Sequence, residues 1–209
     1  MSLSYNKLAG QSAGRIDAIS DAVFGVAMTL LVLEIKVPEF EGNITESALA
    51  HAFFALMPKF LVYFLSFMTA GIFWTGQSAQ FRHIKSSDRN LNWINLLFLL
   101  FVSVLPFSTA FLGDHINFRF SILLYWFNIF LMGLMLYINW EYANRHGFIS
   151  EEMKDQVYIP IKRRIVTAQA LYLAGALLCF INPYIGITFI IAIQLNYAFA
   201  FWGGKSAKK

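Results

Sequence analysis

The feature that most constrains this chain is an alternation between long apolar runs and short basic clusters. Runs of about twenty apolar residues recur along the sequence, and nearly all Lys and Arg residues lie between them. A helix of that length crosses the roughly 30 Å hydrocarbon core of a bilayer. Only 13% of the residues are charged, whereas soluble domains carry about 25%. The pattern therefore predicts an all-α, polytopic membrane protein.

The apolar runs predict six transmembrane helices of about 18 to 24 residues each. They form a single domain over residues 1–209, with a short cytoplasmic linker at about 143–163 that could be helical through Ser150-Glu151-Glu152. The Asn182-Pro183 pair predicts a tight reversal between the last two spans, because proline does not continue a helix. The predicted spans are Asp17–Val37, Phe53–Gly76, Asn92–Leu112, Phe120–Tyr142, Ile165–Asn182 and Tyr184–Trp202.

The distribution of Lys and Arg sets the predicted orientation. With six spans, thirteen of these residues fall on the side of the two termini, and only Lys36, Lys59 and Arg119 fall on the other side. Because cytoplasmic segments carry the excess of basic residues, both termini should lie in the cytoplasm. The opposite side would either concentrate cations or form an ordinary solvated loop. Its acidic residues are Glu34, Glu39, Glu41, Glu46 and Asp114.

Several functional classes find no support in the residues. The net charge of +4 is explained by basic residues beside the spans, so no nucleic-acid partner is expected. The four histidines are far apart, and we find no His-Glu-x-x-His motif, P-loop or dinucleotide fingerprint. The single Cys179 provides no disulfide framework. We therefore expect no enzyme activity, no cofactor and no metal site.

The first predicted helix separates two kinds of side chain. Charged and polar groups enter the membrane at its start. Because buried charge is costly, these groups should have partners within the protein. The alternative is that Asp21 only caps the helix at the membrane interface. Apolar side chains form a stripe along one face, which periodicity alone cannot distinguish from ordinary packing surface. The stripe contains Ile19, Val26, Leu30, Leu33 and Val37, with Thr29 at its edge, whereas Ser20, Asp21, Phe24 and Met28 face roughly the opposite way.

Two segments of the chain resemble a known family. Arg15-x-x-x-Ile19-Ser20-Asp21, followed by the apolar run to Leu33, resembles the Arg-x-x-x-Phe-Ser-Asp signature of the transmembrane protein 175 family of endosomal and lysosomal potassium channels and their prokaryotic relatives. The stretch Asn92–Thr109 is similar to the third helix of that family. Ile19 replaces the Phe of the signature, and the paired His common in the second helix is replaced around Gln77-Ser78.

The resemblance implies a homotetramer in the plasma membrane of a prokaryote, with the first helix of each subunit lining a central pore. Such a pore would conduct potassium with modest preference over sodium, although the potassium-filter sequence Thr-Val-Gly-Tyr-Gly is absent. By the resemblance, Val26, Leu30 and Leu33 would form the constriction, and Thr29 is a candidate selectivity ring. Arg15, Ser20, Asp21 and Asn95 would form a supporting polar network.

Two other classes stay open from the residues. A proton-coupled membrane transporter usually places a carboxylate or histidine near the middle of the membrane. The carboxylates Asp17, Asp21, Glu34 and Glu141 instead lie near the ends of the predicted spans. A membrane enzyme or assembly factor would need a reactive cluster that the sequence does not reveal.

Overall fold

A computed structural model describes residues 13–40, 42–149 and 151–199, and these residues form a helical bundle. The predicted all-α class is confirmed; extended pairing in the described ranges is limited to one isolated bridge between Ile84 and Ile149. The described helices are α2 (Ala13–Leu33), α3 (Glu46–Ala55), α4 (Met57–Phe81), α5 (Arg89–Asp114), α6 (Arg119–Arg145), α7 (Glu151–Leu178) and α8 (Pro183–Phe199).

Four of these helices, α2, α4, α5 and α6, are long and apolar enough to cross a membrane. They correspond to the first four predicted spans. The last two predicted spans do not meet this measure: α7 carries the charged run Lys162-Arg163-Arg164 within its length, and α8 is described over 17 residues to Phe199. The predicted end of the last span, at Trp202, lies outside the described residues. By length and composition, the described residues thus contain four apolar spans where the sequence predicts six.

Two element boundaries also differ from the prediction. The predicted second span starts at Phe53, but the structure places Phe53 in the separate helix α3, which Thr45 caps by accepting a hydrogen bond from the Ala48 amide at 3.2 Å. The predicted linker at about 143–163 is largely helical, because α7 begins at Glu151. Residues such as Glu, Lys and Gln favour helix despite their polarity, so a polar stretch is not in itself a loop.

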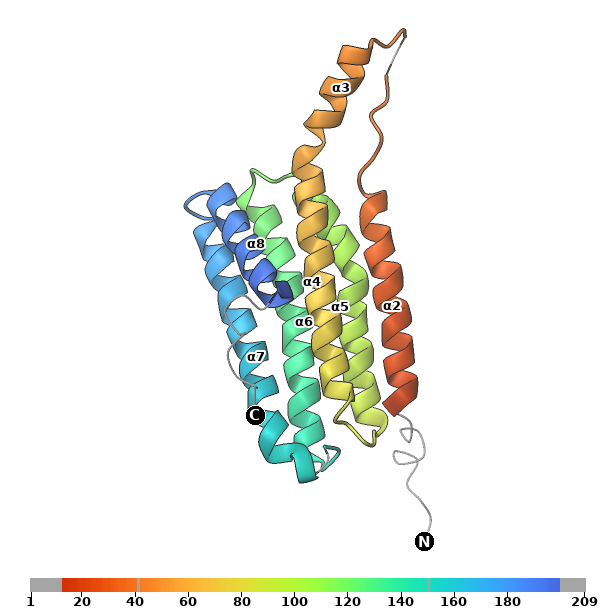
Figure 1. Cartoon of the computed structure of the whole chain (residues 1–209), viewed down its shortest axis with the longest axis vertical. Helices are drawn as coiled ribbons and strands as arrows, with labels where there is room; N and C mark the ends of the chain where they lie inside the picture. Colours follow the sequence, from red (N-terminus) through yellow and green to blue (C-terminus); the bar gives the residue numbers. More distant parts are fainter. Residues whose placement is uncertain (1–12, 41, 150, 200–209) are drawn as a thin grey trace.

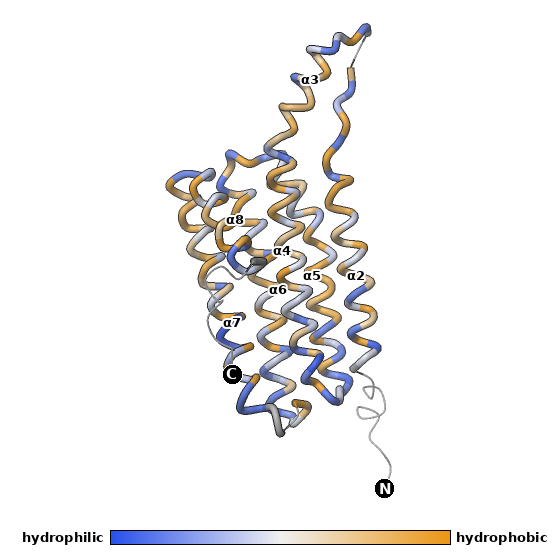
Figure 2. Tube along the Cα trace, viewed as in Figure 1, coloured by the Kyte–Doolittle hydropathy of each residue, from blue (hydrophilic) through white to orange (hydrophobic). Residues whose placement is uncertain are grey.

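The helices lie side by side, with α5 packed against α2, α4 and α6 (Figure 1). Helix α2 lies at one edge of the bundle, and α7 and α8 lie at the other. Helix α3 extends beyond the end of the bundle in line with α4. Hydrophilic residues gather at the first turns of α2 and at the same end of the bundle, opposite α3, whereas the middle of the helices is largely hydrophobic (Figure 2).

Close backbone contact joins α7 and α8. The Asn182 side chain accepts a hydrogen bond from the Tyr184 amide at 2.9 Å, and α8 begins at Pro183, so the predicted reversal is present. A Cβ atom at Gly186 would lie 2.1 Å from Cys179 Sγ and 2.7 Å from the Gly175 carbonyl oxygen. Glycine is therefore required where these two helices meet.

Candidate functional site

Helix α2 packs into the bundle along a single stripe of its surface. Ile16, Ser20, Phe24, Ala27 and Leu31 are all buried, and their spacing of three and four residues places them on one face of the helix. The Phe24 ring packs against Phe98 of α5 with ring centres 5.9 Å apart. This face fixes how α2 is rotated about its own axis.

A buried polar triad ties α2 to its two neighbours. The Gln77 amide nitrogen donates hydrogen bonds to Ser20 Oγ and to Asn95 Oδ1, both at 2.7 Å. The Asn95 amide nitrogen donates to Ser20 Oγ at 3.2 Å, and the Ser20 hydroxyl donates to the Ile16 carbonyl at 2.7 Å. All three side chains are at most 1% exposed, so they have no access to water as an alternative partner. The triad therefore joins α2, α4 and α5 through satisfied, uncharged groups.

A second polar contact joins α2 and α4 on a more exposed surface. The indole nitrogen of Trp74 donates a hydrogen bond to Asp21 Oδ1 at 2.7 Å. A carboxylate acceptor makes this bond stronger than one between neutral groups. Arg15 is exposed, and in the described part of the chain no ion pair links it to Asp21.

The face of α2 opposite the buried stripe is uncovered. The side chains of Val26, Leu30 and Leu33 are 59%, 42% and 69% exposed. Ile19, which the sequence places on the same stripe, is exposed as well; Val37 is exposed but lies beyond the end of α2 at Leu33, four residues short of the predicted end of this span. In contrast, Met28 is half-buried and packs against the core. One side of α2 is thus held by the bundle, and the other presents an apolar surface.

Thr29 lies on the exposed face of α2 with its hydroxyl group bonded to its own helix. The hydroxyl reaches the Val26 and Gly25 carbonyl oxygens at 2.8 and 3.0 Å. Because the hydroxyl proton is donated inward, the lone pairs of the oxygen remain available on the exposed side. A threonine held in this way can offer an oxygen ligand to a cation but has no proton left to donate outward.

The structure brings together only part of the polar network that the sequence predicts. Ser20 and Asn95 are hydrogen-bonded, and Asp21 has a partner in Trp74, whereas Arg15 is exposed and forms no ion pair within the described residues. Gln77 and Trp74 are missing from the predicted set. Gln77 falls in the segment where the sequence departs from the expected histidines. An amide side chain one helical turn after an indole, within an otherwise apolar span, is the sequence signal that could have predicted a role for both residues.

Chemically, the α2 surface can contact lipid, another protein copy or a permeating ion, but it offers no reactive cluster. Among the residues that the structure describes, no group of three or more His, Cys, Asp or Glu side chains is placed to hold a metal ion. The exposed groups between Val26 and Leu33 are methyl-bearing side chains and one hydroxyl. Such a surface suits assembly and ion passage, and it lacks the groups needed for acid, base or nucleophilic catalysis.

Comparison with known protein families identifies the same region of the chain. A family model described as the endosomal/lysosomal potassium channel TMEM175 matches residues 15–106. The matched segment contains all of the exposed α2 surface from Val26 to Leu33 and all three members of the buried triad.

Individual relatives match over different lengths. A potassium channel of Streptomyces collinus is 39% identical over 105 residues, which is half of each chain. A potassium channel of Chamaesiphon minutus is 30% identical over 187 residues, covering 86% of this chain and 91% of that protein. The crystal structure of a lysosomal potassium-selective channel TMEM175 homolog from Chamaesiphon minutus matches with a TM-score of 0.76 and 27% identity, over 90% of this chain and 97% of that one.

Proposed function

Because this chain belongs to the TMEM175 family of endosomal/lysosomal potassium channels, we propose that it is one subunit of a homotetrameric potassium channel whose pore is lined by α2. The relatives that match along most of its length are named as potassium channels. One observation carries the proposal for this particular helix: α2 is rigidly held on one face and presents an apolar, exposed stripe on the other.

A tetramer would supply the enclosed passage that a single subunit lacks. A single bundle of this size does not enclose a water-filled passage, but cyclic symmetry lets each subunit contribute one helix to a shared one. The edge position of α2 suits this role, since α4 and α5 cover it from the inside only. The assembly would bury the Val26 and Leu33 side chains, which are more than half exposed in the isolated subunit.

The proposed conduction mechanism rests on apolar rings. Val26 and Leu33 are seven positions apart, so stacked rings from Val26 through Leu30 to Leu33 would form a neck about 10 Å long. A cation in such a neck keeps its water, which a narrow apolar wall tends to expel, so the barrier to conduction is dewetting. The Thr29 oxygen would replace part of the water shell and would favour potassium over sodium modestly.

In the membrane, α7 and α8 complete the proposed six-span topology. At 1.5 Å per residue, the 17 residues of α8 rise about 25 Å, which crosses most of a thin hydrocarbon core. The bias of Lys and Arg supports a topology with both termini in the cytoplasm, and the bacterial relatives support a channel in the plasma membrane of a prokaryotic cell. A cysteine engineered near the N-terminus should then resist a membrane-impermeant reagent added to intact cells, and rapid labelling would reverse this topology.

Single-channel recording from purified protein in a defined bilayer tests the proposal. Leu30→Asn and Leu33→Asn place an amide in the neck, so they should raise potassium current and weaken discrimination against sodium. Val32→Asn is the matched control: Val32 is 46% exposed on α2 but lies off the predicted stripe. If the ring variants assemble normally and conduct like Val32→Asn, the pore lies elsewhere. Saturable, solute-coupled flux without unitary currents would instead favour a proton-coupled transporter.

A further inference from the structure

A cavity of about 220 Å³ lies on the side of the bundle away from α2. It is a partly open cavity lined by α4, α6, α7 and α8, and most of its wall consists of apolar side chains. Its apolar wall includes Ile72 and Phe73 of α4, Leu136 of α6, and Ile161 and Ile165 of α7. A cavity of this kind, inside the apolar part of a membrane protein, suits a hydrocarbon chain better than water.

The cavity lies beside the last described turns of α8 and the second half of α4. Tyr197 in the last turns of α8 lines the cavity, as do Gly76 and Ala79 near the end of α4. The cavity therefore lies toward the end of α4 that precedes the basic segment Arg82–Arg89.

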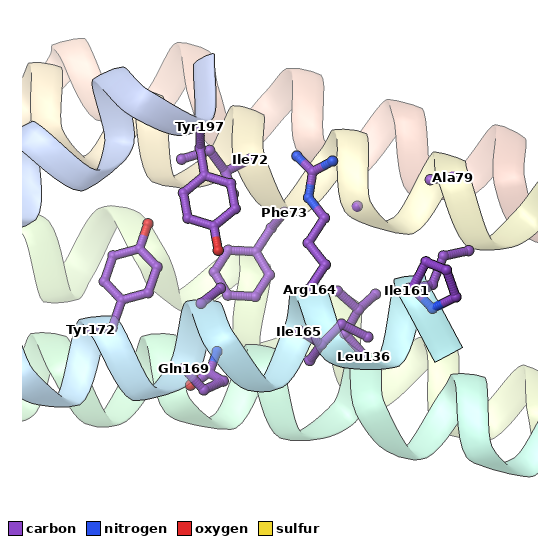
Figure 3. A pocket seen from close by; sticks show the side chains of 13 residues that line it. Ile72, Phe73, Ala79, Leu136, Ile161, Arg164, Ile165, Gln169, Tyr172 and Tyr197 are labelled. Carbon is purple, nitrogen blue, oxygen red and sulfur yellow. The ribbon is translucent and has the colours of Figure 1, made fainter. Parts of the chain in front are cut away.

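A cation lines this cavity without a carboxylate partner. Figure 3 shows Arg164 projecting from α7 and Tyr197 from α8 into the same space, and the guanidinium carbon lies 5.4 Å from the centre of the Tyr197 ring. In the described part of the chain, Arg164 forms no ion pair. Lys162 on the same helix differs, because Glu141 and the Tyr158 hydroxyl bind its ammonium group, each at 3.1 Å.

We propose that this cavity is a binding site for one anionic phospholipid of the cytoplasmic leaflet. The phosphate group would pair with Arg164, and an acyl chain would occupy the apolar space between α4 and α7. Charge complementarity selects this occupant: a neutral chain gains nothing from Arg164, and a second protein copy would have to insert a carboxylate among apolar walls. A phospholipid combines a single anionic group with hydrocarbon at the spacing that a membrane interface provides.

The depth of the site agrees with a headgroup at the membrane surface. In the proposed topology, the C-terminal end of α4 faces the cytoplasm, where juxtamembrane basic residues attract anionic lipids. Arg164 follows Lys162 and Arg163 and precedes the apolar half of α7, so it stands where the helix passes from polar surroundings into hydrocarbon. Long cationic side chains at such positions extend toward the headgroups.

Native mass spectrometry of the full-length protein tests the proposal, with phosphatidylglycerol or phosphatidylcholine of identical chains added back after delipidation. Wild-type protein should retain phosphatidylglycerol in preference to phosphatidylcholine. Arg164→Gln should lower that preference about fivefold, the factor expected for one cation near an anionic headgroup. Arg163→Gln is the matched control, since it removes the same charge from a neighbouring residue that is exposed, as Arg164 is, but does not line the cavity.

A second pair of variants tests the acyl-chain part of the site without changing charge. Ala168→Phe fills the cavity and should reduce retention of both lipids, whereas Thr167→Phe, on an exposed neighbouring position outside the cavity lining, should not. Equal losses of preference in Arg163→Gln and Arg164→Gln would show a diffuse basic surface and overturn the proposal. Unchanged phosphatidylglycerol retention in folded Arg164→Gln protein would overturn it as well. The readout is lipid binding, so it does not depend on the proposed ion conduction.

Discussion

Replacing Ser20 by alanine tests whether the buried triad holds α2 in place. The Ser20 oxygen accepts hydrogen bonds from two other helices, from Gln77 at 2.7 Å and from Asn95 at 3.2 Å. In Ser20→Ala, the Gln77 amide keeps its bond to Asn95 Oδ1, but the Asn95 amide nitrogen loses its bond to Ser20. The variant thus removes two interhelical bonds and leaves a buried donor unsatisfied.

The expected cost follows from these lost bonds. Interhelical hydrogen bonds in membrane proteins contribute about 0.6 kcal/mol on average and about 1.7 kcal/mol at most. Two of them correspond to a loss of roughly 1 to 3 kcal/mol in the free energy of unfolding, a range that also covers an orphaned buried donor. For a chain of this size, that loss lowers the melting temperature by several degrees.

Thermal unfolding in mild detergent, followed by tryptophan fluorescence, measures the effect. Ser103→Ala is the matched control, because Ser103 is exposed on α5 and its hydroxyl bonds only to the Leu100 carbonyl of its own helix, at 2.8 Å. We expect Ser103→Ala to leave the melting temperature nearly unchanged. Adding Asn95→Ala to Ser20→Ala should cost less than the sum of the two single changes, because the two residues share one bond. Equal shifts for Ser20→Ala and Ser103→Ala would refute the role of the triad.

Three further changes follow from the contacts described above. Asp21→Asn keeps an oxygen acceptor for the Trp74 indole but loses the charge, so it should lower the unfolding free energy by about 1 kcal/mol and shift the tryptophan emission; unchanged stability and emission would mean that this bond is absent in solution. Gly186→Ala should destabilise the subunit by about 1 to 3 kcal/mol through its clash with Cys179, seen as a lower melting temperature, and a neutral result would show that α7 and α8 separate easily. Thr29→Val should reduce potassium current or selectivity in single-channel recordings at equal protein amounts. Currents and selectivity equal to those of the wild-type protein would show that Thr29 does not act in the pore.

The long apolar helices could be predicted from the sequence because each carries its own signal. Helices α2, α4, α5 and α6 satisfy the length and hydropathy of a membrane span without reference to any neighbour. The predicted second span includes the end of α3 because Phe53 and Phe54 are apolar, although Thr45 and Glu46 mark the start of a separate helix. The sequence leaves open whether the polar stretch from Glu151 is linker or helix, because a polar helix and a polar linker share a composition; the structure makes it the start of α7.

The partners of α2 could be predicted only in part, because contact between distant residues depends on how helices are rotated. Ser20 and Gln77 are 57 residues apart, and nothing local in the sequence says that their side chains meet. The prediction that Ser20 and Asn95 belong to one polar network comes from the family resemblance. Likewise, Asp21 could be seen to need a partner, but only the structure identifies Trp74.

The composition of the triad determines how α2 responds to acidity. A hydroxyl and two carboxamides neither gain nor lose a proton at any pH that a cell encounters, so these bonds persist in acidic and in alkaline surroundings alike. A histidine at the position of Gln77 would instead acquire a charge below about pH 6.5 and loosen its helix there. Acidification would therefore leave the bonds of the triad intact, and α2 would stay anchored to α4 and α5 at Ser20.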